Sequence, residues 1–93
     1  AYAWLAKAPL DRVIEIHLSG GSEAPPAWTG GRRIRLDSHD ADVPNEVWQL
    51  FDDVWPACQN LRAVTLERIE GSVLGGDVPR LRDTLVRIKE TVA

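Results

Sequence analysis

The sequence predicts an α/β fold built from parallel β/α units. Short apolar stretches rich in β-branched residues alternate along the chain with stretches in which apolar residues recur every three or four positions. Strands that alternate with helices in this way are typical of a parallel sheet covered by helices. The chain has 93 residues, of which 44% are hydrophobic, and this is enough for one small globular domain with a modest core.

The first half of the chain is expected to hold the end of a helix, a strand, a loop and a second strand. Residues 1–8 should end a helix, because Pro9 follows them. A buried strand is expected in residues 12–21 (RVIEIHLSGG), which are rich in β-branched residues and stop at two glycines. Residues 22–31 have the composition of a loop, and residues 32–40 (RRIRLDSHD) are expected to contain a second strand.

The second half is expected to hold a helix, a third strand and a last helix. Asp42 and Pro44 are start signals for a helix over residues 44–57, and its apolar stripe would consist of Val47, Leu50, Phe51 and Val54. Residues 61–70 (LRAVTLERIE) predict the third strand. Asp77 could cap the last helix, which carries on one side Leu81, Leu85, Ile88 and Val92.

Side-chain alternation places ionisable residues on one face of each predicted strand. Aliphatic residues occupy the opposite face. The ionisable residues stand near the carboxyl ends of their strands, and they are His17, Asp37, His39 and Glu67. In a β/α barrel this end of the strands carries the chemistry, and a complete barrel takes about 250 residues. The chain would therefore form only part of such a barrel.

These four side chains predict a metal site. Imidazole and carboxylate together suit Zn, Mn or non-haem Fe. Asp37 and His39 are two residues apart on one strand, so both can reach an ion at the strand end, and Asp40 could orient a ligating imidazole. Against this, a lone histidine in a strand is usually structural, an Asp-x-His triplet often arises by chance, and Glu67 beside Arg68 also fits a surface ion pair. From the residues alone, both interpretations stay open.

Composition and charge argue against several other classes of protein. The net charge is −3 and no basic block is present, so a nucleic-acid partner is not expected. No apolar run is long enough to span a bilayer and no signal peptide is recognisable, so no membrane partner is expected either. Cys58 is the only cysteine, which fits a reducing, cytoplasmic compartment. The sequence contains no methionine, so a fragment or a processed product is expected.

Three strings in a fixed order carry a resemblance to a known family. They are HLSGG at residues 17–21, DSHDADVPNEVW at residues 37–48 and TLER at residues 65–68. In this order and spacing, the chain from about Tyr2 onward resembles the C-terminal part of the multinuclear non-haem iron-dependent oxidases. That family includes the oxidase of methanobactin biosynthesis.

The resemblance implies a fold, a cofactor and a reaction. Residues 1–93 would be the C-terminal part of one domain, the last three β/α units of an incomplete (β/α)8 TIM barrel of the xylose-isomerase type. His17, Asp37 and His39 would be metal ligands and Glu67 a further carboxylate ligand, while earlier strands would complete a site for two or three irons. The metals would activate dioxygen to oxidise cysteine-containing, ribosomally made peptides, often presented by a partner protein. Trp28, in a loop at the barrel mouth, would cover the peptide.

This segment alone is expected to be inactive, and no residue is assigned to the catalytic step itself. It would need the remainder of the barrel, either as a missing N-terminal part or as another chain. Two alternatives are kept. One is another divalent-metal barrel enzyme, of the isomerase or endonuclease-like kind, with Zn or Mn in place of iron. The other is a non-catalytic β/α fragment that assembles with a partner.

Overall fold

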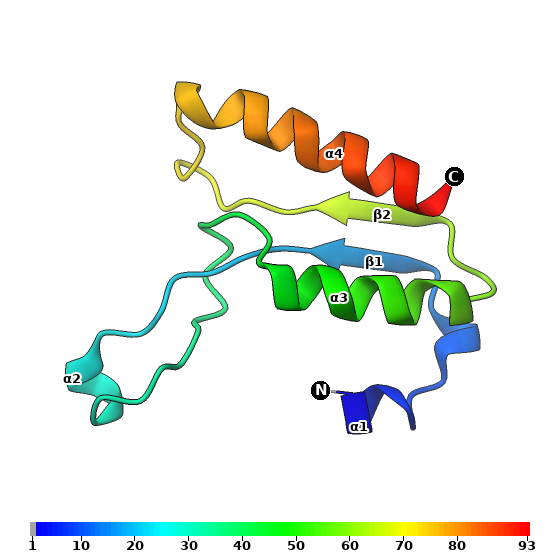
Figure 1. Cartoon of the computed structure of the whole chain (residues 1–93), viewed down its shortest axis with the longest axis horizontal. Coiled ribbons are helices and arrows are strands. Elements are labelled where there is room, and N and C mark those ends of the chain that lie inside the picture. The colour runs from blue at the N-terminus through cyan, green and yellow to red at the C-terminus, as the bar shows by residue number, and fades with distance from the viewer. Residues whose placement is uncertain (1) are drawn as a thin grey trace.

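The computed structural model describes residues 2–93, so Ala1, where the predicted N-terminal helix end begins, lies outside the described residues. The chain runs through α1, β1, α2, α3, β2 and α4 in that order (Figure 1). The helices are α1 (Tyr2–Leu5), α2 (Pro26–Thr29), α3 (Asn45–Val54) and α4 (Val78–Val92), and the strands are β1 (Glu15–Leu18) and β2 (Ala63–Leu66). Short 3-10 turns lie at Leu10–Arg12, Trp55–Ala57 and Gly75–Asp77.

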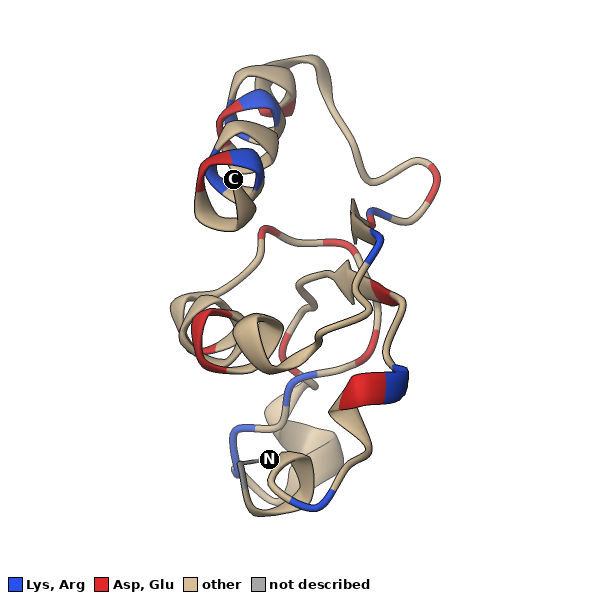
Figure 2. Ribbon diagram, turned by 90° about the vertical axis from the view of Figure 1, so that its right-hand side faces the viewer, with Lys and Arg blue, Asp and Glu red and all other residues tan. Residues whose placement is uncertain are grey.

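The two strands are parallel and pair directly with each other. The register places Glu15 beside Ala63 and Leu18 beside Leu66. Both α3 and α4 lie to one side of the strands (Figure 2), because both helices pack on the same aliphatic face of the sheet. The predicted α/β class with parallel β/α units is therefore confirmed. The opposite face of the sheet carries the polar side chains.

A small core holds this layer together. The buried members come from β1, α3 and α4, and they are Leu18, Trp48, Phe51 and Ile88. Phe51 is only 3% exposed, and its ring meets the ring of Trp48 edge-on at 6.2 Å between centroids. The guanidinium of Arg87 on α4 lies 4.1 Å from the centre of the Trp48 ring, an attractive cation–π arrangement that joins α4 to α3. The apolar stripe predicted for residues 44–57 is confirmed in part, because Val47 and Phe51 pack in the core whereas Leu50 and Val54 line an open groove beside it.

The strand predicted in residues 32–40 is not formed, so the described sheet has two strands where three were expected. These residues belong instead to an excursion, residues 19–44, that leaves the sheet after β1 and returns at α3 (Figure 1). Their extended backbone pairs within the excursion. Glu23 and Arg35 form an antiparallel bridge, and the amide of Leu36 donates to the carbonyl of Ser22 at 2.7 Å. Residues 32–40 thus include extended backbone, but this backbone pairs with nearby residues of the excursion and not with the sheet.

Two glycines allow the base of the excursion to close. A β-carbon on Gly21 would stand 2.0 Å from the carbonyl oxygen of Leu36, and one on Gly20 would stand 2.0 Å from that of Asp42. A carbon and an oxygen that are not bonded to each other do not approach so closely, so neither position has room for any side chain. The glycines that end the predicted first strand therefore serve close backbone packing.

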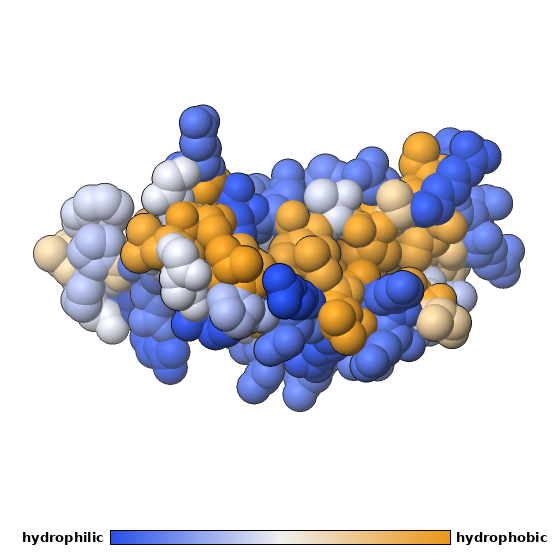
Figure 3. All heavy atoms as spheres, turned by 90° about the horizontal axis from the view of Figure 1, so that it is seen from above, coloured by the Kyte–Doolittle hydropathy of each residue, from blue (hydrophilic) through white to orange (hydrophobic). Residues whose placement is uncertain are grey.

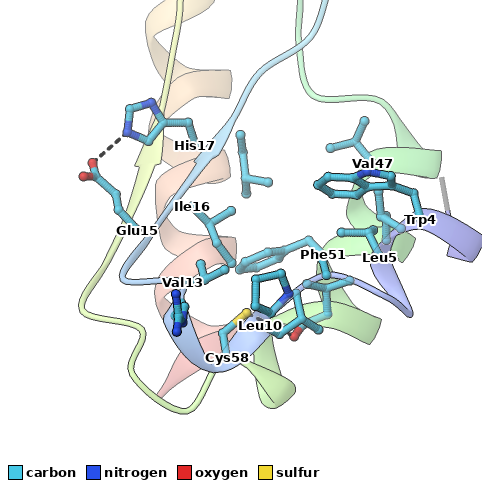
Figure 4. A pocket seen from close by; sticks show the side chains of 16 residues that line it. Trp4, Leu5, Leu10, Val13, Glu15, Ile16, His17, Val47, Phe51 and Cys58 are labelled. Carbon is cyan, nitrogen blue, oxygen red and sulfur yellow. Dashed lines mark hydrogen bonds and ion pairs between the residues drawn. The ribbon is translucent and has the colours of Figure 1, made fainter.

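The apolar side of the molecule is only partly covered within the described residues. An open groove of about 490 Å³ lies between α1, β1 and α3, and its walls include Trp4, Leu5, Leu10, Val47 and Phe51 (Figure 4). Apolar side chains also lie at the surface over α4 (Figure 3), where Leu85 is 53% exposed. The predicted apolar side of α4 is thus divided, since Ile88 and Val92 pack in the core and Leu85 does not. Among residues 2–93, no helix combines the length and apolarity needed to cross a bilayer.

Candidate metal centre

The predicted ligands meet at the carboxyl edge of the sheet. Both strand arrows point toward the side from which the excursion projects (Figure 1). His17 is the third residue of the four-residue β1, and Glu67 follows β2 directly. Asp37 and His39 arrive from the returning arm of the excursion. In parallel β/α folds this edge is where ligands bind.

Glu67 lies between two imidazoles. Its Oε1 is 3.2 Å from Nδ1 of His17, and its Oε2 is 3.7 Å from Nδ1 of His39. The first distance is at the outer limit of a direct hydrogen bond, and the second is a looser electrostatic contact. One carboxylate thus joins a histidine of the sheet to a histidine of the excursion.

His39 is held in an unusual backbone conformation. Its φ angle is +53°, in the left-handed region, which costs a residue other than glycine roughly 1–2 kcal/mol. Its carbonyl oxygen accepts a hydrogen bond of 2.7 Å from the amide of Ile69, just beyond Glu67. Its Nε2 lies 2.6 Å from Oδ1 of Asp37, a carboxylate that is 93% exposed. The Ile69 amide therefore holds the backbone at His39, while the imidazole contacts a local, exposed carboxylate on one side and Glu67 on the other.

Glu15 belongs to the same cluster, although the sequence analysis did not select it. Its Oε1 lies 2.7 Å from Nε2 of His17 and accepts a hydrogen bond of 3.0 Å from the hydroxyl of Thr65. Figure 4 shows Glu15 and His17 together, on the side of β1 away from Phe51. The signal was present in the sequence, because Glu15 and His17 are two residues apart and share a strand face.

The Glu15 contact shifts two pKa values in this part of the site. Its hydrogen bond raises the pKa of His17, with a smaller contribution from Glu67. The same hydrogen bond, together with that from Thr65, lowers the pKa of Glu15. Because Glu15 occupies Nε2, the nitrogen of His17 that faces Glu67 is Nδ1.

Asp40 makes different contacts from those expected. It was predicted to orient an imidazole, but its carboxylate accepts hydrogen bonds from the amide and hydroxyl of Ser22, at 3.0 and 2.8 Å, and from the hydroxyl of Ser38 at 2.6 Å. These donors lower its pKa. In this structure Asp40 therefore closes the base of the excursion, and Glu15 makes the carboxylate–imidazole contact that Asp40 was expected to make.

Trp28 lies at the far end of the excursion, in α2 (Figure 1). Its side chain is 73% exposed. The excursion starts from the carboxyl edge of the sheet, so Trp28 lies on the same side of the molecule as the histidine cluster. Its contact with a peptide stays a prediction.

The donor chemistry of the cluster fits a divalent transition metal, while its imidazoles are paired with its own carboxylates. Two imidazoles and three carboxylates are a set suited to iron, zinc or manganese. Within residues 2–93, however, no three His, Cys, Asp or Glu side chains are arranged as they stand to hold one ion. The imidazole nitrogens instead face carboxylate oxygens. Metal binding replaces protons on such groups, so the same atoms are available to an ion.

A family model with the description "RiPP precursor modification enzyme MbnB/TglH/ChrH" matches residues 1–91. The chain belongs to this family. Members of this family are described as enzymes that modify the precursors of ribosomally made peptides. The family membership predicted from the three sequence strings is therefore confirmed. No solved structure matched the chain.

Curated relatives match this chain over somewhat more than half of its length. A UPF0276 protein of Caulobacter vibrioides is 43% identical over 51 residues, which are 55% of this chain and 16% of that protein. A UPF0276 protein of Bordetella pertussis is 46% identical over 52 residues, 56% of this chain and 17% of that protein. A UPF0276 protein of Rhizobium meliloti is 40% identical over 58 residues, which are 62% of this chain and 18% of that protein. The matched part thus spans about a sixth of the length of these relatives.

Proposed function

We propose that this chain supplies part of the metal site of a non-haem iron-dependent oxidase that acts with dioxygen on cysteine-containing, ribosomally made peptides. The observation that carries the proposal is the position of Glu67 between the imidazoles of His17 and His39, at the carboxyl edge of a parallel sheet. The family description supplies the class of substrate, a ribosomally made peptide precursor.

The side chains in the cluster have distinct tasks in this proposal. His17 and His39 offer imidazole nitrogens, and Glu67 and Asp37 offer carboxylate oxygens, which together suit non-haem iron. Glu15 holds the other nitrogen of His17 and so fixes the orientation of that ring. When bound, iron would supply the one-electron and dioxygen chemistry that side chains lack. Two or three ions would need further ligands, from the remainder of a barrel.

The remaining parts of the proposal concern the rest of the protein. The matched relatives are about six times as long as the aligned segment, which supports further strands, in the same chain or another, that complete a TIM barrel. The peptide would lie across the carboxyl edge, where the exposed Trp28 can stack on it. A separate peptide-presenting protein would deliver it.

The proposal is tested on the intact gene product, purified without oxygen and analysed for metal. The variants His39→Ala and Glu67→Gln remove a nitrogen and a charged oxygen from the centre of the cluster. Glu23→Gln is the matched control, because Glu23 is also a carboxylate with a charged partner, Arg33, but lies in the excursion away from the histidines.

We expect near-stoichiometric iron in the wild type and the control, and at least tenfold less in the two site variants. Retention of iron by both site variants would contradict the assignment. Tight binding of Zn or Mn without dioxygen consumption would favour the isomerase or endonuclease-like alternative, for which the same donors are suitable. No tight metal in the intact wild type would favour the non-catalytic fragment.

A further inference from the structure

Arg68 directly follows Glu67 and is turned away from the cluster into a polar network behind it. Its side chain is only 9% exposed. Its Nη1 donates to Oδ1 of Asp42 at 3.1 Å, and its Nη2 lies 3.7 Å from Oδ2 of Asp77. Its Nε and Nη2 also donate to the hydroxyl and carbonyl oxygens of Ser72, at 3.3 and 3.0 Å. All three guanidinium nitrogens therefore have partners.

These partners belong to three different segments of the chain. Asp42 stands three residues after His39 at the end of the excursion, Ser72 lies in the turn after β2, and Asp77 directly precedes α4. Arg80 contacts both aspartates from the outside, so that two guanidinium groups neutralise two carboxylates. Arg80 is 59% exposed, whereas Arg68 occupies the interior of the network.

The network fixes the segment that carries Glu67 against the segment that carries His39. One link is the ion pair of Arg68 with Asp42. The other is the hydrogen bond from the Ile69 amide to the His39 carbonyl. Both links lie directly after Glu67 in sequence, at Arg68 and Ile69, and they join the same two segments as the 3.7 Å contact between Glu67 and His39. The left-handed backbone at His39 needs support of this kind, because a strained residue keeps its conformation only when its surroundings impose it.

We propose that Arg68 is a positioning residue of the metal site, which sets Glu67 against His39 from behind without touching the metal. The inference rests on the proposed function. A planar guanidinium reaches Asp42, Ser72 and Asp77 at once, and the point charge of a lysine does not reproduce this fork. Loss of the fork would let the excursion arm move relative to β2 and would spread the two ligands apart.

The test uses the intact gene product and Fe²⁺ itself as the probe, with anaerobic competition against a chelator of known affinity. The variant is Arg68→Lys, and the matched control is Arg33→Lys, which makes the same change in an ion pair of the excursion, at an arginine that is 83% exposed. Asp42→Asn is a second variant. Asp42 is 51% exposed, so this change weakens the network with little risk to folding. The unfolding temperature of each metal-free protein is measured in parallel.

We expect Arg68→Lys to weaken Fe²⁺ binding by about 10- to 100-fold, as is common for groups that orient ligands. Asp42→Asn should weaken it in the same direction, and Arg33→Lys should leave it unchanged. A residue that only stabilised the fold would lower the unfolding temperature without changing the Fe²⁺ affinity of the folded protein.

The outcomes separate this inference from the function on which it rests. If the wild type binds no Fe²⁺, the proposed function fails and the role of Arg68 fails with it. If the wild type binds Fe²⁺ and both network variants bind equally well, the role of Arg68 is refuted while the proposed function stands. An equal loss of Fe²⁺ affinity in Arg33→Lys would also refute the role of Arg68. If Arg68→Lys does not fold, Asp42→Asn alone decides.

Discussion

Replacing Gly21 by alanine should open the base of the excursion. The new β-carbon would stand 2.0 Å from the carbonyl oxygen of Leu36 and 3.2 Å from the hydroxyl of Ser38. The two arms would have to separate by about 1 Å or more to restore ordinary contact. The hydrogen bond from the Leu36 amide to the Ser22 carbonyl, now 2.7 Å, would be lost, and those from the Ser22 amide would weaken.

The free-energy cost of Gly21→Ala follows from these contacts. Each hydrogen bond contributes about 1 kcal/mol and forced overpacking costs about 1–3 kcal/mol, so we expect the closed base to lose about 2–4 kcal/mol. Because the loss is local, hydrogen exchange measures it better than global unfolding. Peptides that contain Leu36 should exchange at least tenfold faster in the variant, since about 1.4 kcal/mol corresponds to a factor of ten.

Gly76→Ala is the matched control, because nothing lies within 4 Å of the position of its added β-carbon and its φ angle is not positive. It should change the exchange of residues 34–40 by less than twofold, an effect within the usual range for surface changes. If Gly21→Ala exchanges no faster than Gly76→Ala around Leu36, the close approach described here does not hold the excursion, and the reasoning is wrong.

Three further predictions concern stability. Trp48→Ala should lower the free energy of unfolding by about 3–5 kcal/mol in urea titrations, because Trp48 is 5% exposed in the core. Trp28→Ala, at a position 73% exposed, should change the same quantity by less than about 0.5 kcal/mol. Asp40→Asn should destabilise the protein at pH 7, because the hydrogen bonds from Ser38 and Ser22 lower the pKa of Asp40 and so stabilise its ionised form. This stabilisation is present above the ordinary aspartate pKa of about 3.9 and is lost as the pH falls through the lower folded value. The unfolding temperatures of wild type and variant should therefore converge between pH 4 and the acid limit of the native state, and a constant difference would contradict this.

The sequence predicted the layers of the fold because hydrophobic periodicity reports burial directly. Leu18 and Phe51 stand in the core where the strand and helix patterns put them, and His17 faces the polar side of the sheet as alternation requires. The contact between His17 and Glu67 could also be predicted from the sequence, because both residues stand at the carboxyl ends of parallel strands.

The parts that sequence reasoning did not predict depend on pairing between distant segments. Residues 32–40 have a strand-like pattern, but such a pattern does not show which segment the strand pairs with. The amide of Leu36 donates to the carbonyl of Ser22 and not to a strand of the sheet. Asp40 was assigned to an imidazole by proximity in sequence, whereas the fold brings Ser22 to it from 18 residues away. The left-handed backbone at His39 has no sequence signal of its own.

The closed base of the excursion has a consequence for how such a protein can diversify. The two arms are joined at Gly21, Ser22 and Asp40, so the segment beyond them, including α2, begins and ends at the same place whatever its length. Doubling the length of a flexible loop costs only about 0.6 kcal/mol in closure entropy. Residues 25–33 can therefore be exchanged, lengthened or shortened without opening the base of the excursion. Under the proposed function, the tip can vary in sequence and length while the proposed ligands at the base keep their places.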